Sequence, residues 1–273
     1  MRDLKSKNVV VTGAASGIGK ATAELLAKRG ARLHLCDLDE AKLKEAVAPL
    51  GAAVITTRRV DVSKRADVEA FARDVETSIG GAVDVLVNNA GVGLGGNILE
   101  TSLEDWEWVL GVNLWGVIHG CHFFVPKMVA ARRGHVVNVA SGLGLVAAPD
   151  VIGYATSKFA VVGLSESMRG ELHAHGIGVS TICPGIIDTN IVQTTRYKRD
   201  AEATRDRVVR LYKKRAYPAD KVASAVVAAI ENDRGVVPVS PEAWVGYWLK
   251  RLSPSLAGVV TRVAAKQAAP KPR

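Results

Sequence analysis

The sequence has 273 residues, of which 48% are hydrophobic, and it carries a formal net charge of +9. This length and composition suit one large folded domain, alone or with a tail, that can bury a core. The three cysteines are odd in number and widely spaced, and the histidines lack partners at ligand spacing, so neither disulfides nor a metal site is expected. No apolar run approaches the ~20 residues of a membrane span. The first strand-like run starts by Asn8, which leaves no room for a signal peptide, so we expect a cytoplasmic protein.

Short apolar runs typical of buried strands alternate with helical stretches along most of the chain. This alternation predicts an α/β fold built on a doubly wound, mostly parallel sheet of seven strands. We place a single domain at residues 1–240 and an amphipathic, basic helical tail at 241–273. The strand-like runs begin near Asn8, Arg32, Ala53, Asp84, Gly134, Ile177 and Gly235.

A glycine-rich turn follows the first strand and leads into a helical stretch from Lys20 to Arg29. Between Thr12 and Gly19 the glycines are spaced as GxxxGxG. Glycines allow a tight turn and a close approach to the backbone, and the helix N-terminus adds free N–H groups and a positive dipole. An ordinary strand–helix turn also favours glycine, but three glycines in this context favour a diphosphate cradle. Its candidate binding residues are Gly13, Ser16, Gly17, Ile18 and Gly19.

An acidic residue, Asp37, ends the second strand. A carboxylate there can accept hydrogen bonds from both hydroxyls of an adenosine ribose, and it would repel a 2′-phosphate. Leu38 follows, and no Arg or Lys lies among residues 14–16 to bind such a phosphate. Asp39 is the better N-cap for the next helix, which leaves Asp37 for the ribose. The sequence therefore favours NAD over NADP, with Asp37 and Leu38 in contact with the cofactor.

The segment from Ser102 to Arg133 is predicted to be a long helix that opens with a capping-box pattern. This helix and a second one, from Gly153 to His173, are apolar around much of their circumference. One sheet face cannot cover both sides of two such helices. We therefore expect them to pack against a second copy of the chain, in a homodimer or homotetramer.

Ser141, Tyr154 and Lys158 form a set suited to acid–base chemistry. Tyr154 and Lys158 are four residues apart, so on a helix both side chains point the same way. An ammonium fixed beside the phenol would lower the pKa of Tyr154 from about 10 toward neutral pH. Ser141 could then hydrogen-bond an alcohol or ketone oxygen. Because Tyr and Lys at this spacing are common on solvated helices, the interpretation depends on the accompanying motifs.

Taken together, the motifs resemble those of the short-chain dehydrogenase/reductase family, over about residues 5–240. The turn from Thr12 to Gly19 is similar to the family's TGxxxGxG motif, and residues 88–91 are similar to its NNAG motif. Pro184-Gly185, followed by Thr189, is similar to the segment on the nicotinamide side of the cofactor. The resemblance implies a Rossmann-type fold and an NAD-dependent oxidoreductase. Its reaction would be hydride transfer that interconverts a secondary alcohol and a ketone.

The resemblance also implies roles for individual residues. Tyr154 would be the general acid/base, and Ser141 would orient and polarise the substrate oxygen. Lys158 would bind the nicotinamide ribose and lower the pKa of Tyr154. Asn113 would complete the catalytic tetrad and hold a water that links Lys158 to solvent, through a kink in its helix. The further cofactor contacts would be Asp61 and Val62 at the adenine, then Asn89, Ala90, Gly91, Tyr154, Lys158, Pro184, Gly185, Ile187 and Thr189.

The sequence also indicates a class of substrate and leaves two alternative functions open. The predicted pocket lining, at residues 93–96, 143–146 and 186, is mostly apolar, which favours a lipophilic substrate, although these residues could instead pack the loops. A dinucleotide-sensing regulator is an alternative function, but such proteins usually lose the tyrosine or the lysine. A lipid-modifying reductase docked on a membrane surface is another. Basic residues crowd segment 196–215 without a base-stacking platform, so nucleic acid is not an expected partner.

The tail has an apolar stripe of its own. Trp244, Trp248 and Leu252 recur every four residues, and Pro254 separates them from a second stripe that starts at Leu256. The chain's own substrate cleft, a neighbouring subunit or a membrane surface could cover these residues. Packing on the protein is the commonest outcome for such a helix, so we expect the tail to roof the substrate entrance.

Overall fold

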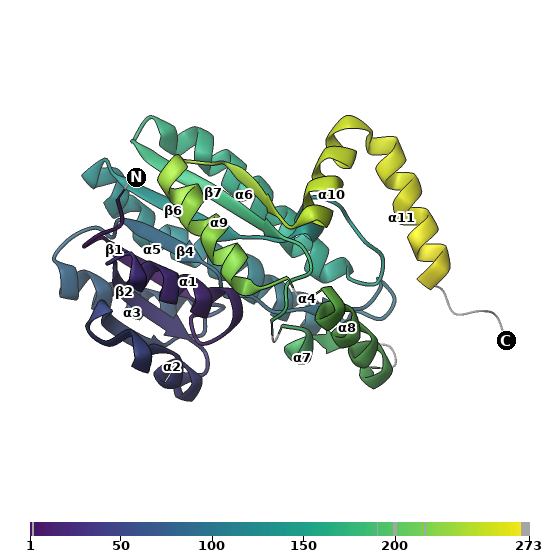
Figure 1. Cartoon of the computed structure of the whole chain (residues 1–273), viewed down its shortest axis with the longest axis horizontal. Helices are drawn as coiled ribbons and strands as arrows, with labels where there is room; N and C mark the ends of the chain where they lie inside the picture. Colours follow the sequence, from purple (N-terminus) through teal and green to yellow (C-terminus); the bar gives the residue numbers. More distant parts are fainter. Residues whose placement is uncertain (2, 190, 199–200, 216, 269–273) are drawn as a thin grey trace.

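The centre of the molecule is a parallel sheet of seven strands in the order β3-β2-β1-β4-β6-β7-β9 (Figure 1). This computed structural model describes residue 1 and residues 3–189, 191–198, 201–215 and 217–268. The predicted doubly wound fold is confirmed, and each strand begins within one residue of its predicted start. The strands are β1 (Asn8–Thr12), β2 (Arg32–Asp37), β3 (Val54–Arg59), β4 (Val85–Asn88), β6 (Gly134–Val139), β7 (Ile177–Pro184) and β9 (Val236–Val239).

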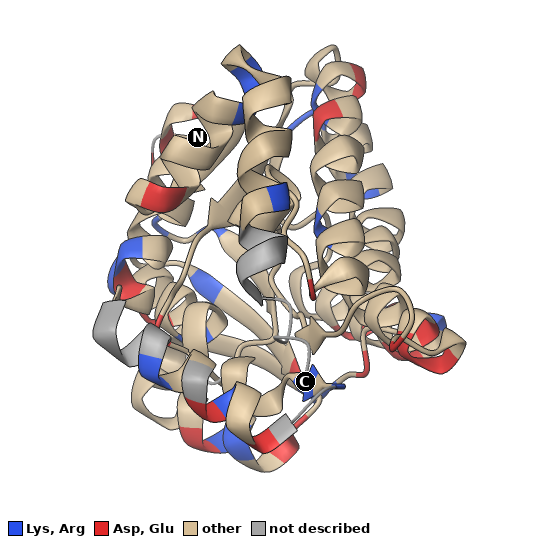
Figure 2. Cartoon of the chain, turned by 90° about the vertical axis from the view of Figure 1, so that its right-hand side faces the viewer, with Lys and Arg blue, Asp and Glu red and all other residues tan. Residues whose placement is uncertain are grey.

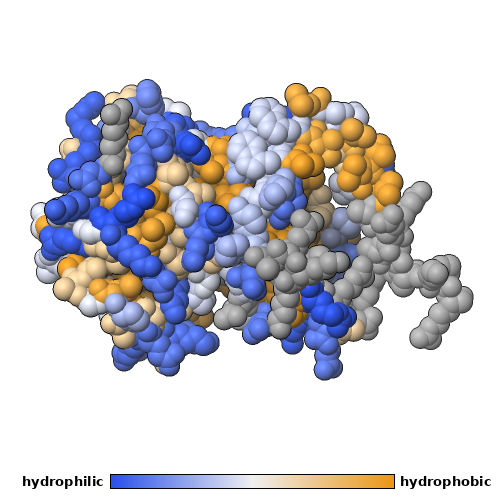
Figure 3. Space-filling model, in the orientation of Figure 1, coloured by the Kyte–Doolittle hydropathy of each residue, from blue (hydrophilic) through white to orange (hydrophobic). Residues whose placement is uncertain are grey.

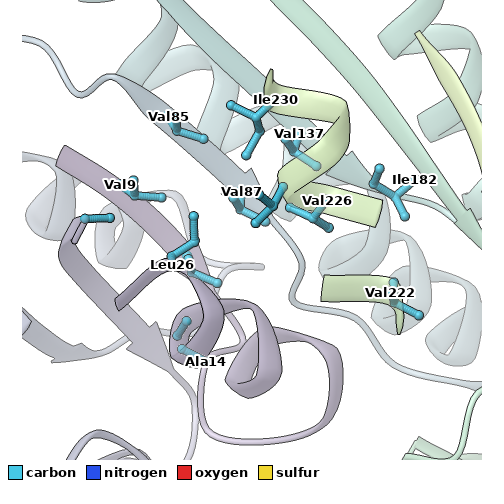
Figure 4. Close-up of a cluster of buried hydrophobic side chains, with 14 of the residues drawn as sticks. Val9, Ala14, Leu26, Val85, Val87, Val137, Ile182, Val222, Val226 and Ile230 are labelled. Atoms are coloured by element: carbon cyan, nitrogen blue, oxygen red, sulfur yellow. The ribbon is translucent and has the colours of Figure 1, made fainter. Parts of the chain in front are cut away.

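Helices cover both faces of the sheet, because the central strands are apolar on both sides. On one face, α1 (Gly17–Lys28) and α9 (Ala219–Asn232) pack against Val85 and Val87, and Figure 4 shows their meeting at Leu26 and Val226. Leu86, between those valines, belongs to the core on the other face. That face is covered by α3 (Arg65–Ile79), α5 (Gly116–Ala131) and α6 (Ile152–His173).

The second strand leads into α2 (Glu40–Val47), whose start agrees with the predicted cap. The carboxylate of Asp39 accepts a hydrogen bond from the backbone N–H of Lys42 at 3.0 Å. This bond satisfies one of the free donors in the first turn and leaves Asp37 outside the helix. A 3₁₀ turn, Ala48–Ala53, then connects α2 to β3.

The predicted long helix is three pieces in the structure. α4 (Leu103–Leu110) begins with a capping box in which Ser102 and Asp105 bond each other's backbone N–H groups. A wider π-type turn, Gly111–Trp115, follows and continues into α5. The whole stretch, Leu103–Ala131, is long and apolar enough to cross a membrane by length and composition, contrary to our expectation from the sequence. This is weak support for a span, because a helix that packs in a protein core meets the same criteria.

A two-stranded sheet that the sequence did not predict lies beside the main one. β5 (Leu94–Gly95) pairs with β8 (Arg196–Tyr197), which lies between α7 (Ile191–Thr194) and α8 (Ala201–Arg215). The ammonium of Lys198 pairs with the buried carboxylate of Asp105, so the basic segment is tied to α4. Other basic positions predicted in this segment, residue 199 and the side chains at 207 and 213–215, lie outside the described residues.

The tail forms two helices, α10 (Pro241–Leu252) and α11 (Pro254–Ala268), and residues 269–273 lie outside the described part. The tail lies beside the loop after Ser141, since Ala243 packs near Gly142 and Thr261 hydrogen-bonds the carbonyl of Ala147. That it roofs the substrate entrance stays a prediction. The prediction that the chain itself covers the apolar stripe is wrong. The side chain of Trp248 is 50% exposed and that of Leu252 is 79% exposed.

The three cysteines are free and buried, as expected for small core side chains. Burial raises the pKa of the Cys121 and Cys183 thiols to about 12, so both stay protonated at neutral pH. Within the described residues, no group of three or more His, Cys, Asp or Glu side chains is placed to hold a metal ion.

Two buried histidines predict acid lability. Burial lowers the pKa of His34 and of His135 to about 4, below the ordinary value of 6.5. The unfolded chain therefore binds protons first as the pH falls, and the stability present above pH 6.5 is lost between there and pH 4. We expect the free energy of unfolding to drop by roughly 2 kcal/mol per histidine between about pH 7.5 and 5. In urea denaturation, His135→Gln should lose less free energy of unfolding over this pH range than the unmutated protein does. The control His173→Gln, at an exposed position, should lose as much as the unmutated protein.

Candidate functional site

The predicted site residues gather along one edge of the sheet. Because every strand of the main sheet is parallel to its neighbours, their carboxyl ends lie on the same side. The predicted site residues lie at or just after these carboxyl ends: the glycine turn, Asp37, Asp61, the segment after β4, Ser141 and the segment after β7. Ligands bind in the crevice at this edge in open α/β sheets.

Close backbone packing explains the glycine turn. A Cβ at Gly19 would lie 2.0 Å from the carbonyl oxygen of Gly13, and one at Gly13 would lie 2.8 Å from the Cα of Ala90. Gly13 and Gly17 also have φ angles of +67° and +52°, which favour glycine. These close contacts and φ angles require glycine at positions 13, 17 and 19, which explains the spacing of the motif.

The first turn of α1 is built to receive an anion. Ser16 occupies the N-cap, and its described side chain makes no capping hydrogen bond to the helix. The first turn of α1, which contains Ile18, therefore has free backbone N–H groups. These groups and the positive end of the helix dipole lie next to the glycine turn. A diphosphate fits this arrangement, because its oxygens can accept those hydrogen bonds and its charge complements the dipole.

The segment after β4 is bound to the same turn. The side-chain amide of Asn89 donates to the carbonyls of Thr12 and Gly13, at 2.9 and 3.1 Å. The hydroxyl of Thr12 accepts hydrogen bonds from the backbone N–H groups of Asn89 and Ala90. The two neighbouring strand ends therefore hold the cradle as one rigid unit.

The carboxylate of Asp37 is also tied to the glycine turn. It accepts hydrogen bonds from the backbone N–H of Ala15 at 2.9 Å and of Asp39 at 3.0 Å. Each oxygen has a second lone pair, so the carboxylate is oriented and can still accept from ribose hydroxyls. Leu38, the next residue, is 56% exposed and presents an apolar surface at this end of the cradle.

The predicted adenine contacts follow β3. Asp61 accepts hydrogen bonds from the backbone N–H and the hydroxyl of Ser63, which leaves its carboxylate turned into its own loop. Val62 is buried, and a Cβ at Gly116 would lie 2.8 Å from its side chain. His119 of α5 bonds the carbonyl of Val62, and Gly116 begins the same helix, so the loop is held against α5.

Asn113 and Lys158 meet below the segment after β4. Asn113 lies in the π-type turn and is fully buried, and its amide bonds the backbone of Val92 and the hydroxyl of Ser157. Lys158 of α6 donates to the carbonyl of Val139 at 3.0 Å. A Cβ at Gly91 would lie 3.3 Å from the Asn113 oxygen and 3.4 Å from the Lys158 nitrogen, so only glycine fits comfortably between them.

Burial changes the acidity of both members of the Tyr–Lys pair. It lowers the pKa of Lys158 to about 8, which keeps about nine-tenths of the side chains charged at pH 7. The pKa of Tyr154 is raised by burial, although a hydrogen bond with Ser141 acts in the opposite direction. The expected lowering of the Tyr154 pKa by lysine is thus absent here. Desolvation decides the direction, and the ammonium, 5.7 Å from the ring centroid, donates its hydrogen bond to the Val139 carbonyl.

The segment after β7 closes the other side of the site. Thr189 lies against the glycine turn, since its side chain would be 3.2 Å from a Cβ at Gly17. Pro184 ends the strand and Ile187 is buried. Gly185 donates to the carbonyl of Val239 at 3.0 Å, so this segment is held by β9.

Three residues that position the site were not among the predicted ones. Thr12 holds Asn89 and Ala90, and Ser157 connects Asn113 to the carbonyl of Tyr154. Glu242, the first acid of the tail, accepts a hydrogen bond from the backbone N–H of Ile186 at 2.9 Å. The motif spacing offered a signal for Thr12 alone, because the other two contacts depend on tertiary packing.

Much of the predicted pocket lining packs the loops. Leu94 and Leu145 are buried, and the glycines at 93 and 95 lie against Thr195, just before β8, and Tyr197 of β8. The apolar side chains near Ser141 that keep partial exposure are Leu143, Val146 and Ile186.

Comparison with known proteins places this chain in one family. A family model described as short chain dehydrogenase matches residues 7–200. The probable oxidoreductase EphD of Mycobacterium tuberculosis is 40% identical over 255 residues, covering 90% of this chain and 43% of EphD. The chain thus spans less than half the length of that relative. The CLA biosynthesis dehydrogenase/reductase of Lactiplantibacillus plantarum is 33% identical, over 89% of this chain and 91% of that protein.

Solved structures agree with the family model. A short chain dehydrogenase/reductase from Burkholderia phymatum, in complex with NAD, has a TM-score of 0.87 and 34% sequence identity to this chain. The comparison covers 100% of this chain and 99% of the other. The cradle described above and this NAD-bound relative both support a nicotinamide dinucleotide as the cofactor.

Proposed function

The chain belongs to the short-chain dehydrogenase family, and we propose that it is a dehydrogenase/reductase that interconverts a secondary alcohol and a ketone with NAD(H). Tyr154 is the proposed general acid/base. The observation that carries the proposal is the position of Ser141, Tyr154 and Lys158 at the sheet edge that holds the dinucleotide cradle. A proton donor and a nucleotide site at the same edge of the sheet suit redox chemistry on a carbinol carbon.

Each residue of the set has a separate task. A bound nicotinamide supplies the hydride acceptor or donor at its C4 atom. The Tyr154 oxygen takes the hydroxyl proton when an alcohol is oxidised and returns it when a ketone is reduced. Ser141 orients the substrate oxygen, and Lys158, held by the Val139 carbonyl, keeps positive charge near the phenol.

We propose a lipophilic substrate, on the exposed side chains near Ser141. Leu143, Val146 and Ile186 are apolar and keep partial exposure. An apolar pocket with a few fixed polar groups binds such a substrate and orients its oxygen.

The direct test is NADH absorbance with a panel of secondary alcohols and ketones of increasing chain length. We expect turnover, with KM falling as the apolar part grows. Measurable NADH binding without turnover of any member of the panel would instead support the alternative of a dinucleotide-sensing regulator.

The oriented carboxylate of Asp37 should select the cofactor. We expect kcat/KM for NAD to exceed that for NADP by at least ~10-fold, about 1.4 kcal/mol, because a 2′-phosphate would meet the negative charge. Asp37→Ala should narrow the ratio, and Asp39→Ala, which removes a neighbouring carboxylate from a helix cap, should leave it unchanged. Equal efficiency of both cofactors in the unmutated enzyme would contradict the assignment.

The apolar helices α5 and α6 support the proposal of a homodimer or homotetramer. Trp115, at the start of this helix pair, is 53% exposed in the single chain. Light scattering at micromolar concentration should give twice or four times the chain mass, and Trp115→Glu should shift it toward monomer. A monomeric unmutated protein would contradict this expectation.

A further inference from the structure

The helices of the tail present their apolar side chains away from the protein. Eight of the fourteen exposed large hydrophobic side chains in the described residues lie between Trp244 and Val263. Figure 3 shows a hydrophobic surface over α11 and its junction with α10, and Figure 1 shows that the two helices extend from the body of the molecule. A surface helix of a soluble protein normally turns this face inward.

Both helices rest on the body through small residues, and α10 also through Tyr247, which packs against the core, and Arg251, which pairs with Glu166. Ala243 is buried near Gly142, and Gly246 faces Val146. On α11, Ala257 is buried and Thr261 contacts Ala147. The large apolar residues lie on other faces of the two helices, at Trp244, Val245, Trp248, Leu252, Leu256, Val259, Val260 and Val263.

Beyond Glu242 the charge of the tail is of one sign. After Glu242 the sequence has six Lys or Arg residues and no Asp or Glu. In Figure 2 the described part of α11 carries a basic band and no acidic one. A symmetric pairing of two such tails would bring like charges together, which disfavours a second tail as the cover. Apolar stripes with tryptophan and flanking basic residues are typical of helices that lie in a membrane interface.

We propose that α10 and α11 dock the protein on an anionic membrane surface. The apolar stripes enter the interface between headgroups and acyl chains, and Lys250 and Arg262, whose side chains are exposed, face the lipid phosphates. The contact between α11 and the loop after Ser141 brings the substrate side of the enzyme close to that surface. This docking does not depend on the proposed reaction.

Co-sedimentation of the full chain with lipid vesicles tests the proposal. The probes are phosphatidylcholine vesicles and vesicles with roughly one-third phosphatidylglycerol, at about 0.1 and 0.5 M NaCl. We expect binding to the anionic vesicles at low salt and at least ~5-fold weaker binding at high salt or to the neutral vesicles.

Two double variants separate the contributions. Trp244→Ser with Trp248→Ser removes apolar contact, and Lys250→Glu with Arg262→Glu removes charge, so each should weaken anionic vesicle binding at least ~5-fold. Leu99→Ser with Leu103→Ser is the matched control, because these leucines are 92% and 77% exposed but lie outside the tail. NADH binding should stay unchanged in all three variants, which shows that they fold.

Three results would overturn the proposal. In the first, the unmutated protein fails to bind anionic vesicles; in the second, the leucine control loses as much vesicle binding as the tail variants; in the third, the tail variants keep full vesicle binding. If the tail variants also give smaller particles in light scattering, a second copy of the chain covers the stripe instead.

Discussion

Tyr154→Phe is expected to lower kcat by ~10²–10⁴-fold, because the variant keeps the ring and loses only the hydroxyl that moves the proton. Binding of NADH should change by less than about threefold, since the cradle is built from the glycine turn, Asn89 and the first turn of α1. Stopped-flow turnover and fluorescence titration with NADH measure the two quantities separately.

The control for this variant is Tyr217→Phe, which removes a phenolic hydroxyl from a residue that precedes α9 and packs against the core. It should keep nearly full activity. The pH profile adds a second readout. Burial raises the pKa of Tyr154, so alcohol oxidation should speed up as the pH rises through that pKa, and Tyr154→Phe should lose this dependence. If Tyr154→Phe kept more than half of the activity, Tyr154 would not be the general acid/base.

Lys158→Met is expected to damage both rate and cofactor binding. Methionine is a flexible, unbranched side chain that can occupy the space of the lysine stem without its charge. The variant removes the ammonium held by the Val139 carbonyl and by the packing against Gly91. Loss of charged hydrogen bonds of about 1.5–3 kcal/mol corresponds to roughly 10–100-fold weaker NADH binding, and kcat should fall by at least ~10²-fold.

Lys221→Met, at an exposed position of α9, is the matched control and should change neither quantity. Thermal denaturation separates the site effect from a loss of fold. Lys158→Met no longer buries a charge, but it leaves the Val139 carbonyl without its lysine donor. These two changes in the free energy of unfolding partly offset each other. An unchanged Kd for NADH would show that Lys158 does not bind the cofactor.

The sheet and the cradle could be predicted from the sequence because their signals are local. A strand buried on both faces must be apolar along its length, so the runs at Val9–Val11 and Val85–Val87 mark strands regardless of their neighbours. The glycine spacing is likewise local, because it marks positions where the backbone leaves no room for a side chain. A Cβ at Gly19 would lie 2.0 Å from the carbonyl oxygen of Gly13. Asp39 could be recognised as a helix cap because capping joins residues three apart in sequence.

The acidity of the Tyr154–Lys158 pair could not be predicted in this way. Sequence spacing correctly places Tyr154 and Lys158 on one helix, but it does not say which group the ammonium bonds. The Val139 carbonyl comes from β6 and competes for Lys158, and the surrounding core raises the pKa of Tyr154 by desolvation.

The sequence by itself determined the strands, the order of the motifs and the apolar stripes of the tail, because each follows from residues close together in the chain. Tertiary structure alone decided which groups meet across long separations. It joined Glu242 to Ile186, tied Lys198 to Asp105 and left Trp248 exposed rather than packed. Periodicity shows that a helix has an apolar face, but what covers that face depends on the shape and charge of the surfaces that folding brings beside it.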